Sequence, residues 1–231
     1  LYTLVPSHMR EPYLVHLLHH PPCQKVEVRT DLSDVYRTHK PKLPREEAPA
    51  YPLSIIFVAR CKSAELLSRM LTELGVPNVS LHSMLPQSTR LHNLHMFRAR
   101  RVPILISTDV GSRGLDVPDV ELVVNWDVPA AWEDYVHRVG RTARKGRPGW
   151  AVSFVTEHDV DLVQTIEDKI HKTLTEWDMP ESQVLERLSH VSAAKRVASM
   201  ALHDEKFGEQ RERNKRKAQA SQPRSKKHHV Q

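Results

Sequence analysis

The sequence predicts an α/β fold: an open, mainly parallel sheet with helices on both faces, arranged in three layers. Two observations carry this prediction. Short runs of apolar and β-branched residues, each long enough for one buried strand, recur along the chain. Between them lie stretches whose apolar residues recur at helical spacing, and this alternation builds a sheet covered on both sides. The length of 231 residues suits one such domain with an appendage.

The expected strands are the apolar runs rich in β-branched residues. In chain order they run from Tyr2 to Val5, Ser54 to Val58, Val79 to Leu81, Ile104 to Ser107, Leu122 to Asn125 and Trp150 to Val155. Three intervening helices are marked by apolar residues on one helical face, which we interpret as core. These stripes are Ala64, Leu67, Leu71 and Leu74; Leu91, Leu94 and Phe97; and Val160, Val163, Ile166 and Ile170.

Residues 1–178 are expected to form this domain. Within it, residues 19–53 hold several prolines, many charges and few apolar residues, so we expect a long, mostly irregular surface loop. Residues 179–210 are expected to form a helical extension packed on the domain through Val184, Leu188 and Val191. Residues 211–231 are expected to be a basic tail that stays disordered without a partner.

The net charge of +6 is concentrated in this tail, where eight basic residues face one acidic residue, Glu212. The basic residues are Arg211, Arg213, Lys215, Arg216, Lys217, Arg224, Lys226 and Lys227. Such a tail can attract polyanions through non-specific phosphate contacts. The remainder of the chain is nearly neutral, so it would need local clusters to bind nucleic acid.

Several classes of protein find no support in the sequence. No stretch approaches the roughly 20 apolar residues needed to cross a bilayer, so no membrane contact is expected. Cys23 and Cys61 are the only cysteines, which favours a reducing intracellular compartment over a disulfide scaffold. His92 and His95 would share a helical face, but no further ligand completes a metal site. No feature specifically supports a homo-oligomer.

The most specific cluster is the octet from His137 to Arg144, in which Arg138, Arg141 and Arg144 recur every third residue around Gly140. Three guanidinium groups beside a glycine that permits close backbone approach suit a polyphosphate ligand. The alternative is a surface helix end that happens to carry several arginines.

A second cluster, from Ser107 to Asp116, follows an expected strand. Its hydroxyl and backbone N–H groups can bind phosphate, and its carboxylate can accept a hydrogen bond from a ribose hydroxyl. The alternative is an ordinary polar loop between a strand and a helix. Because ligands gather beyond the carboxyl ends of parallel strands, we expect this cluster and the others to lie there.

Two weaker elements precede these clusters. In the segment from His82 to Arg90, Gln87 and Arg90 stand where a helix begins, and a helix N-terminus with an arginine one turn inside can bind phosphate. A helix with one surface arginine is the alternative. The segment from Ser54 to Arg60 joins a buried strand, in which Phe57 is assigned to packing, to a polar end.

Together these four elements resemble, in order and spacing, four motifs in the C-terminal RecA-like lobe of DEAD-box ATP-dependent RNA helicases. In chain order these are motif IV, the Q-x-x-R element, motif V and motif VI. The resemblance implies a P-loop NTPase fold. Histidine at the first position of the octet, where related helicase groups often have glutamine, favours the DEAD-box type. The family usually has glycine where this chain has Ala143, and alanine where it has Gly111.

The resemblance assigns roles to individual residues. Arg141 and Arg144 would be arginine fingers that contact the γ-phosphate of ATP, Asp116 would approach the ATP ribose, and His137 and Arg138 would help to couple the two lobes. The residues expected at the RNA backbone are Ser83, Gln87, Arg90, Thr108, Arg113 and Gly114. The substitution at Ala143 adds one methyl group and is not expected to abolish the site.

Half of the enzyme that the family implies has no counterpart in the sequence. A Gly-rich loop ending in Gly-Lys-Thr or Gly-Lys-Ser and an acidic metal motif do not occur. We therefore expect a fragment that is inactive alone and that needs an N-terminal RecA-like lobe, which would hold most of the ATP and its Mg²⁺. The alternative is a non-catalytic module that binds RNA or an assembly factor.

A subgroup resemblance rests on three features: the Thr142 to Gly146 variant, the segment from Asp204 to Phe207 and the basic tail. Together they look like helicases of eukaryotic small-subunit ribosome assembly. This resemblance implies a role in rRNA processing, a nucleolar location within the nucleus and a ribosome-assembly protein as a partner.

Overall fold

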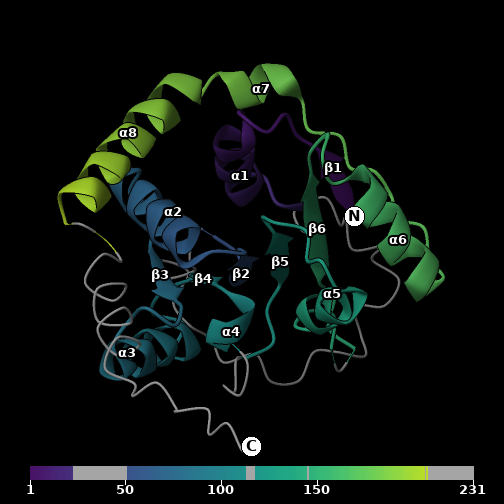
Figure 1. The fold of residues 1–231 in the computed structure, drawn as a ribbon, viewed down its shortest axis with the longest axis horizontal. Helices are drawn as coiled ribbons and strands as arrows, with labels where there is room; N and C mark the ends of the chain where they lie inside the picture. The colour runs from purple at the N-terminus through teal and green to yellow at the C-terminus, as the bar shows by residue number, and fades with distance from the viewer. Residues whose placement is uncertain (23–50, 113–117, 145, 206, 208–231) are drawn as a thin grey trace, which may run out of the picture.

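The computed structural model describes residues 1–22, 51–112, 118–144, 146–205 and 207. In this part of the chain, six parallel strands form one sheet in the order β1-β6-β5-β2-β4-β3 (Figure 1). The strands are β1 (Tyr2–Leu4), β2 (Ser54–Phe57), β3 (Asn78–Leu81), β4 (Ile104–Ser107), β5 (Leu122–Asn125) and β6 (Trp150–Val155). Each agrees with its predicted position to within one residue at either end.

Helices lie on both faces of the sheet, as predicted. Figure 1 shows α1, α2, α7 and α8 on one side and α3, α4 and α5 on the other. The described helices are α1 (Arg10–His19), α2 (Cys61–Glu73), α3 (Gln87–Arg98), α4 (Asp109–Ser112), α5 (Trp132–Val139), α6 (Val160–Ile170), α7 (Glu181–Leu185) and α8 (Leu188–Asp204).

Alternate strand residues supply two separate cores. Ile56 and Val124 belong to the cluster that includes α1 and α2, whereas Ile55 and Val123 belong to the cluster that includes Leu94 and Phe97 of α3. Successive side chains of a strand point to opposite faces, and apolar residues at both positions therefore require cover on both sides. This confirms the three-layer α/β prediction.

Helix α1 was not predicted. Its sequence is apolar around most of its circumference, and Leu14, Leu17 and Leu18 are fully buried. A helix buried on all sides lacks the one-sided stripe that marks a surface helix. The predicted loop was therefore wrong in starting at His19, which is the last residue of α1; residues 23–50 of that loop lie outside the described residues.

The segment that follows α6 forms two helices, α7 and α8. Val191, Ala194 and Ala198 of α8 are buried in the same cluster as Leu67, Met70 and Leu71 of α2. Burial of apolar surface contributes about 25 cal/mol per Å². Because small alanines let α8 approach α2 closely, the extension shares the core of the domain. In the described residues, no helix is long and apolar enough to span a membrane.

Candidate functional site

The octet begins on the last turns of α5 and continues into the loop that follows it. Helix α5 starts beyond the carboxyl end of β5, and the chain then returns along the sheet to the opposite end. There Val120, two residues before β5, donates its N–H to the Arg141 carbonyl at 2.9 Å. The prediction that every cluster lies at the carboxyl ends of the strands was therefore wrong for Arg141 and Arg144, because α5 carries the octet from one end to the other.

Arg138 is the internal anchor of this region and is 2% exposed. Its guanidinium donates to both carboxylate oxygens of Asp109, with Nε to Oδ1 at 2.7 Å and Nη2 to Oδ2 at 2.6 Å. Its Nη1 donates to the Asp127 carbonyl at 2.7 Å, and the group lies 5.3 Å from the centre of the Phe57 ring. Arg138 thus joins α5 to the ends of β2, β4 and β5 within this lobe. Coupling to another lobe stays a prediction.

The two candidate arginine fingers differ in their surroundings. Arg141 is half-buried, and its side chain has no hydrogen bond or ion pair to another described residue. Arg144 is 47% exposed and lies 3.4 Å from the carboxylate of Asp119. Both guanidinium groups are therefore available for a new ligand, since an exposed ion pair at this distance contributes less than about 1 kcal/mol.

These contacts connect the octet to the segment that immediately follows Asp116. Asp119 pairs with Arg144, and Val120 forms a parallel bridge with Thr142, whose hydroxyl donates to the Val120 carbonyl at 2.7 Å. Arg113, Gly114 and Asp116 themselves lie outside the described residues. The fold therefore brings Arg141 and Arg144 beside residues 118–120, although the sequence separates the two clusters.

The loop of the octet is closely packed from behind. A Cβ atom added to Gly149 would lie 2.0 Å from the Thr142 hydroxyl oxygen and 2.6 Å from the Ala143 nitrogen. Ala143 itself has φ +55°, a left-handed conformation that favours glycine. Because of this positive φ, glycine suits this position of the octet. Alanine adds backbone strain there, although the loop still forms.

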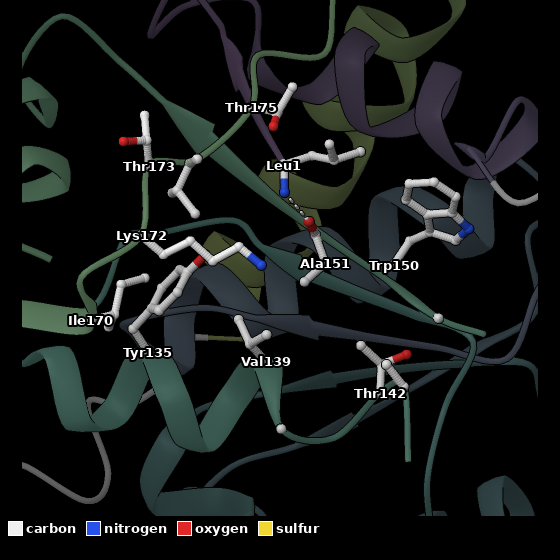
Figure 2. A pocket seen from close by; sticks show the side chains of 14 residues that line it. Leu1, Tyr135, Val139, Thr142, Trp150, Ala151, Ile170, Lys172, Thr173 and Thr175 are labelled. Atoms are coloured by element: carbon white, nitrogen blue, oxygen red, sulfur yellow. Dashed lines mark hydrogen bonds between the residues drawn. The ribbon is translucent and has the colours of Figure 1, made fainter. Parts of the chain in front are cut away.

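Behind the loop lies a hollow of about 450 Å³, which Figure 2 shows from close by. Tyr135 and Val139 of α5 form one wall, Trp150 and Ala151 of β6 form another, and the segment from Ile170 to Thr175 closes the side. The Leu1 amino group donates to the Ala151 carbonyl at 2.9 Å and fills part of the space. Apolar side chains such as Val139 and Trp150 support the octet from this side, and Lys172 and the Leu1 amino group are the charged groups that line the hollow.

The residues expected at the RNA backbone lie at the other end of the strands. Ser83 and Gln87 are exposed beyond β3, and Arg90 donates from Nη1 to the Gln87 amide oxygen at 2.9 Å. Thr108 follows β4 and is only 5% exposed, with its N–H directed to the Leu81 carbonyl at 3.3 Å. Gln87 and Arg90 are thus hydrogen-bonded to each other on the first turn of α3. His137, the first residue of the octet, is exposed on α5.

Asp127 is a structural centre that the sequence reasoning did not single out. Its carboxylate accepts hydrogen bonds from Arg10 at 2.9 Å and from the Ala59 N–H at 2.7 Å, and Arg10 also stacks over the Trp126 ring at 4.3 Å. With Arg60 and Ser63, these residues line a hollow of about 360 Å³. The position of Asp127 two residues after β5 was the available signal, because polar residues gather beyond strand ends.

The donor set fits phosphate better than it fits a metal. Arg141 and Arg144 offer planar, permanently charged donors that can bind phosphate oxygens in pairs. Among the described residues, no group of three or more histidines, cysteines and carboxylates could hold a metal ion. The described part of the octet therefore offers groups that can contact phosphate oxygens.

Comparisons with known proteins agree with this geometry. Residues 45–146 match the family described as helicase conserved C-terminal domain. The ATP-dependent RNA helicase DBP8 of Mycosarcoma maydis is 53% identical over 242 residues, covering 94% of this chain and 46% of that protein. DBP8 of Saccharomyces cerevisiae strain S288c is 44% identical over 218 residues, covering 94% of this chain and 44% of that protein. The chain thus spans less than half the length of these relatives.

Solved structures show the same fold. The Escherichia coli DEAD-box protein SrmB, bound to the regulator of ribonuclease activity A, is 31% identical with a TM-score of 0.62, covering 78% of this chain and 90% of that one. The C-terminal domain of the DEAD-box protein Dbp5 is 32% identical with a TM-score of 0.52, covering 64% and 82%. With the octet, the sheet and these relatives in agreement, this chain belongs to the DEAD-box helicase family and forms its C-terminal RecA-like lobe.

Proposed function

We propose that this chain is the second lobe of an ATP-dependent RNA helicase and that it completes an ATP site held mainly by an N-terminal RecA-like lobe. The observation that carries this proposal is the contact of the octet with residues 119 and 120. It brings Arg141 and Arg144 to the segment that leads directly from Asp116, the residue expected at the ribose.

Arg141 and Arg144 act on the γ-phosphate in this proposal. An arginine supplied across an interface stabilises the charge on a transferring phosphoryl group and can raise the rate by about 10³ to 10⁵. Bound ATP supplies the phosphoryl group, and Mg²⁺ is held mainly by the other lobe. Arg138 would hold α5 in place from within, so that the exposed His137 and the two fingers face the other lobe together.

The second part of the proposal is an RNA surface beyond β3 and β4. Ser83, Gln87 and Arg90 present hydroxyl, amide and guanidinium groups there, and Thr108 follows the neighbouring strand. Arg113 and Gly114 are expected to extend this surface. These groups suit the sugar and phosphate backbone, which carries no base sequence, so the enzyme would bind RNA without sequence preference through this lobe.

Turnover in the full-length protein tests the arginine fingers. Arg141→Ala and Arg144→Ala should each lower RNA-stimulated ATP hydrolysis by about 10³-fold while RNA binding stays near normal. Arg147→Ala is the matched control, because this exposed arginine lies three residues beyond the octet. Unchanged turnover in the two finger variants would contradict the assignment. Normal RNA binding by a full-length protein without any RNA-stimulated hydrolysis would instead favour the non-catalytic module.

We propose further that the full protein acts in rRNA processing and small ribosomal subunit assembly, in the nucleolus, with an assembly protein as a partner. The support is the subgroup resemblance of the Thr142 to Gly146 variant and of the basic tail. Depletion of the full-length protein should cause small-subunit rRNA precursors to accumulate, and a tagged copy should concentrate in the nucleolus. Normal precursor levels together with a cytoplasmic signal would contradict this role.

A further inference from the structure

The end of the extension is tied to α2 by a two-pronged ion pair. Arg69 of α2 donates to both carboxylate oxygens of Glu205, with Nη1 to Oε1 at 2.8 Å and Nη2 to Oε2 at 2.5 Å. Glu205 is the residue directly after α8, and its side chain is 58% exposed. Paired hydrogen bonds of this kind fix orientation as well as distance.

The same arginine continues the contact inward to the end of β3. Arg69 Nε donates to Glu65 Oε1 at 3.1 Å. The other oxygen of Glu65, Oε2, accepts from the Ser80 hydroxyl at 3.2 Å and lies 3.3 Å from Nε2 of His82, a residue with no exposed surface. Glu65 accepts from Arg69 and Ser80, and as a carboxylate it can only accept from His82 as well, so Nε2 of His82 is the donor. The hydrogen bonds from His82 and Arg69 lower the pKa of Glu65.

A second contact from the extension reaches His82 directly. The ring of Phe207 meets the His82 ring edge-on, with centroids 6.0 Å apart, and the Phe207 N–H donates to the Leu202 carbonyl at 3.2 Å. His82 is therefore enclosed between Glu65 on one side and the end of the extension on the other.

His82 is the residue directly before Ser83, where the proposed RNA surface begins. Its carbonyl accepts the Leu85 N–H at 3.2 Å, which shapes the turn that leads to Gln87 and Arg90. We infer that Glu205 and Phe207 are positioning residues, which hold the β3–α3 turn in its RNA-binding form through Arg69, Glu65 and His82. This inference rests on the proposed function, because it assigns the extension a role in RNA affinity at the same surface.

The geometry separates this role from simple support of the fold. Helix α8 is already held on α2 by the buried Val191, Ala194 and Ala198. The half-exposed Glu205 lies beyond this apolar seam, so its loss should leave the helix docked. What changes is the restraint on Arg69 and, through Glu65, on His82.

The test compares Glu205→Ala with Asp204→Ala in the full-length protein. Both changes remove one negative charge from the same helix end, but Asp204 has an ion pair only with the neighbouring His203 among the described residues. Glu205→Ala should raise the RNA concentration for half-maximal ATPase about two- to fivefold, as expected for one partly exposed ion pair. The turnover at saturating RNA should hold steady. Phe207→Ala, with no change in charge, should shift the same concentration in the same direction.

A double-variant cycle shows whether the effect passes through the turn. In a Gln87→Ala background the Glu205→Ala shift should shrink, because residues of one network are not additive. Equal shifts for Glu205→Ala and Asp204→Ala, or an undiminished shift in the Gln87→Ala background, would overturn the inference. Direct binding of single-stranded RNA gives the same comparison without turnover. If the full-length protein bound RNA but lacked RNA-stimulated hydrolysis, the enzyme role would be refuted. The RNA affinities of the variants would still test this inference.

Discussion

The nearly buried Arg138 forms a bidentate ion pair with the partly exposed Asp109, although 29 residues separate them in the sequence. The pair fastens α5, on which the octet begins, to the start of α4, which lies within the cluster from Ser107 to Asp116. The two motifs are therefore joined inside one lobe before any nucleotide or second lobe is present.

The first prediction concerns the stability of the chain. Arg138→Ala removes a nearly buried guanidinium that donates to the Asp109 carboxylate and the Asp127 carbonyl, so the free energy of unfolding should fall by about 3 kcal/mol. Arg141→Ala, at a half-buried arginine whose side chain has no partner among the described residues, should change it by less than about 0.5 kcal/mol. Urea unfolding of the two variants measures the difference, and equal losses would show that Arg138 is no anchor.

The second prediction tests the close packing behind the octet. Gly149→Ala places a methyl group against Thr142 and Ala143, so the loop that presents Arg141 and Arg144 must move. A displacement of about 1 Å near a reacting group can cost 10²-fold in rate. We expect ATP turnover of the full-length protein to fall by at least about tenfold, with RNA affinity retained.

Gly75→Ala is the control for this change. Gly75 has φ +72° and open space where a Cβ would lie, so the substitution adds backbone strain between α2 and β3, outside the octet. It should lower stability without lowering turnover at a temperature where both variants are folded. If Gly149→Ala turned over ATP as fast as Gly75→Ala, the loop would be tolerant of displacement and the packing argument would fail.

The third prediction concerns the alanine in the octet. A left-handed residue other than glycine costs about 1 to 2 kcal/mol, whereas glycine costs about 0.4 to 1 kcal/mol through the entropy of the unfolded chain. Ala143→Gly should therefore stabilise the chain by about 0.5 kcal/mol. Ala99→Gly, at an exposed position with φ −72°, should instead destabilise it. Thermal unfolding of both variants checks the signs, and a loss of stability for Ala143→Gly would contradict the strain.

The fold was predictable because its signals are local. Each strand is a short run that contains at least one β-branched residue, as in Ile104–Ser107, and each of the three predicted helices has apolar residues at helical spacing. Helix α1 gave no such signal, since residues like Leu14 and Leu17 are buried on every side. Helical periodicity shows in a sequence when a helix has one buried face and one exposed face, and α1 has almost no exposed face.

The site was predictable in its residue types but not in its arrangement. The spacing of Arg138, Arg141 and Arg144 indicated a cluster of guanidinium groups, yet nothing local shows that Arg138 turns inward to Asp109. That difference arises from the path of α5 along the sheet. The helix buries Arg138, whereas Arg141 and Arg144 lie in the loop beyond its last residue. The link from Glu205 to His82 is likewise a product of packing between distant segments.

The fourth prediction concerns the basic tail, residues 211–231, whose structure lies outside the described residues. Each phosphate contact on a single strand contributes about 0.7 to the slope of log affinity against log salt. Deletion of the tail should therefore flatten this slope for single-stranded RNA by at least about one unit. Replacing its eight basic residues by glutamine, at unchanged length, should have the same effect. An unchanged slope in both proteins would remove the tail from RNA binding.

The last prediction is a pH dependence centred on Glu65. The hydrogen bonds from His82 and Arg69 lower the pKa of Glu65 below its ordinary value of 4.5, so the folded chain binds its proton less readily than the unfolded chain. The resulting stability is present above pH 4.5 and is lost as the pH falls through the folded pKa. The gap in unfolding free energy between the parent chain and Glu65→Gln should therefore be larger at pH 7 than at pH 3.5. Glu73→Gln, at an exposed carboxylate of the same helix, should show no such narrowing, and an equal gap at both pH values for Glu65→Gln would refute the coupling.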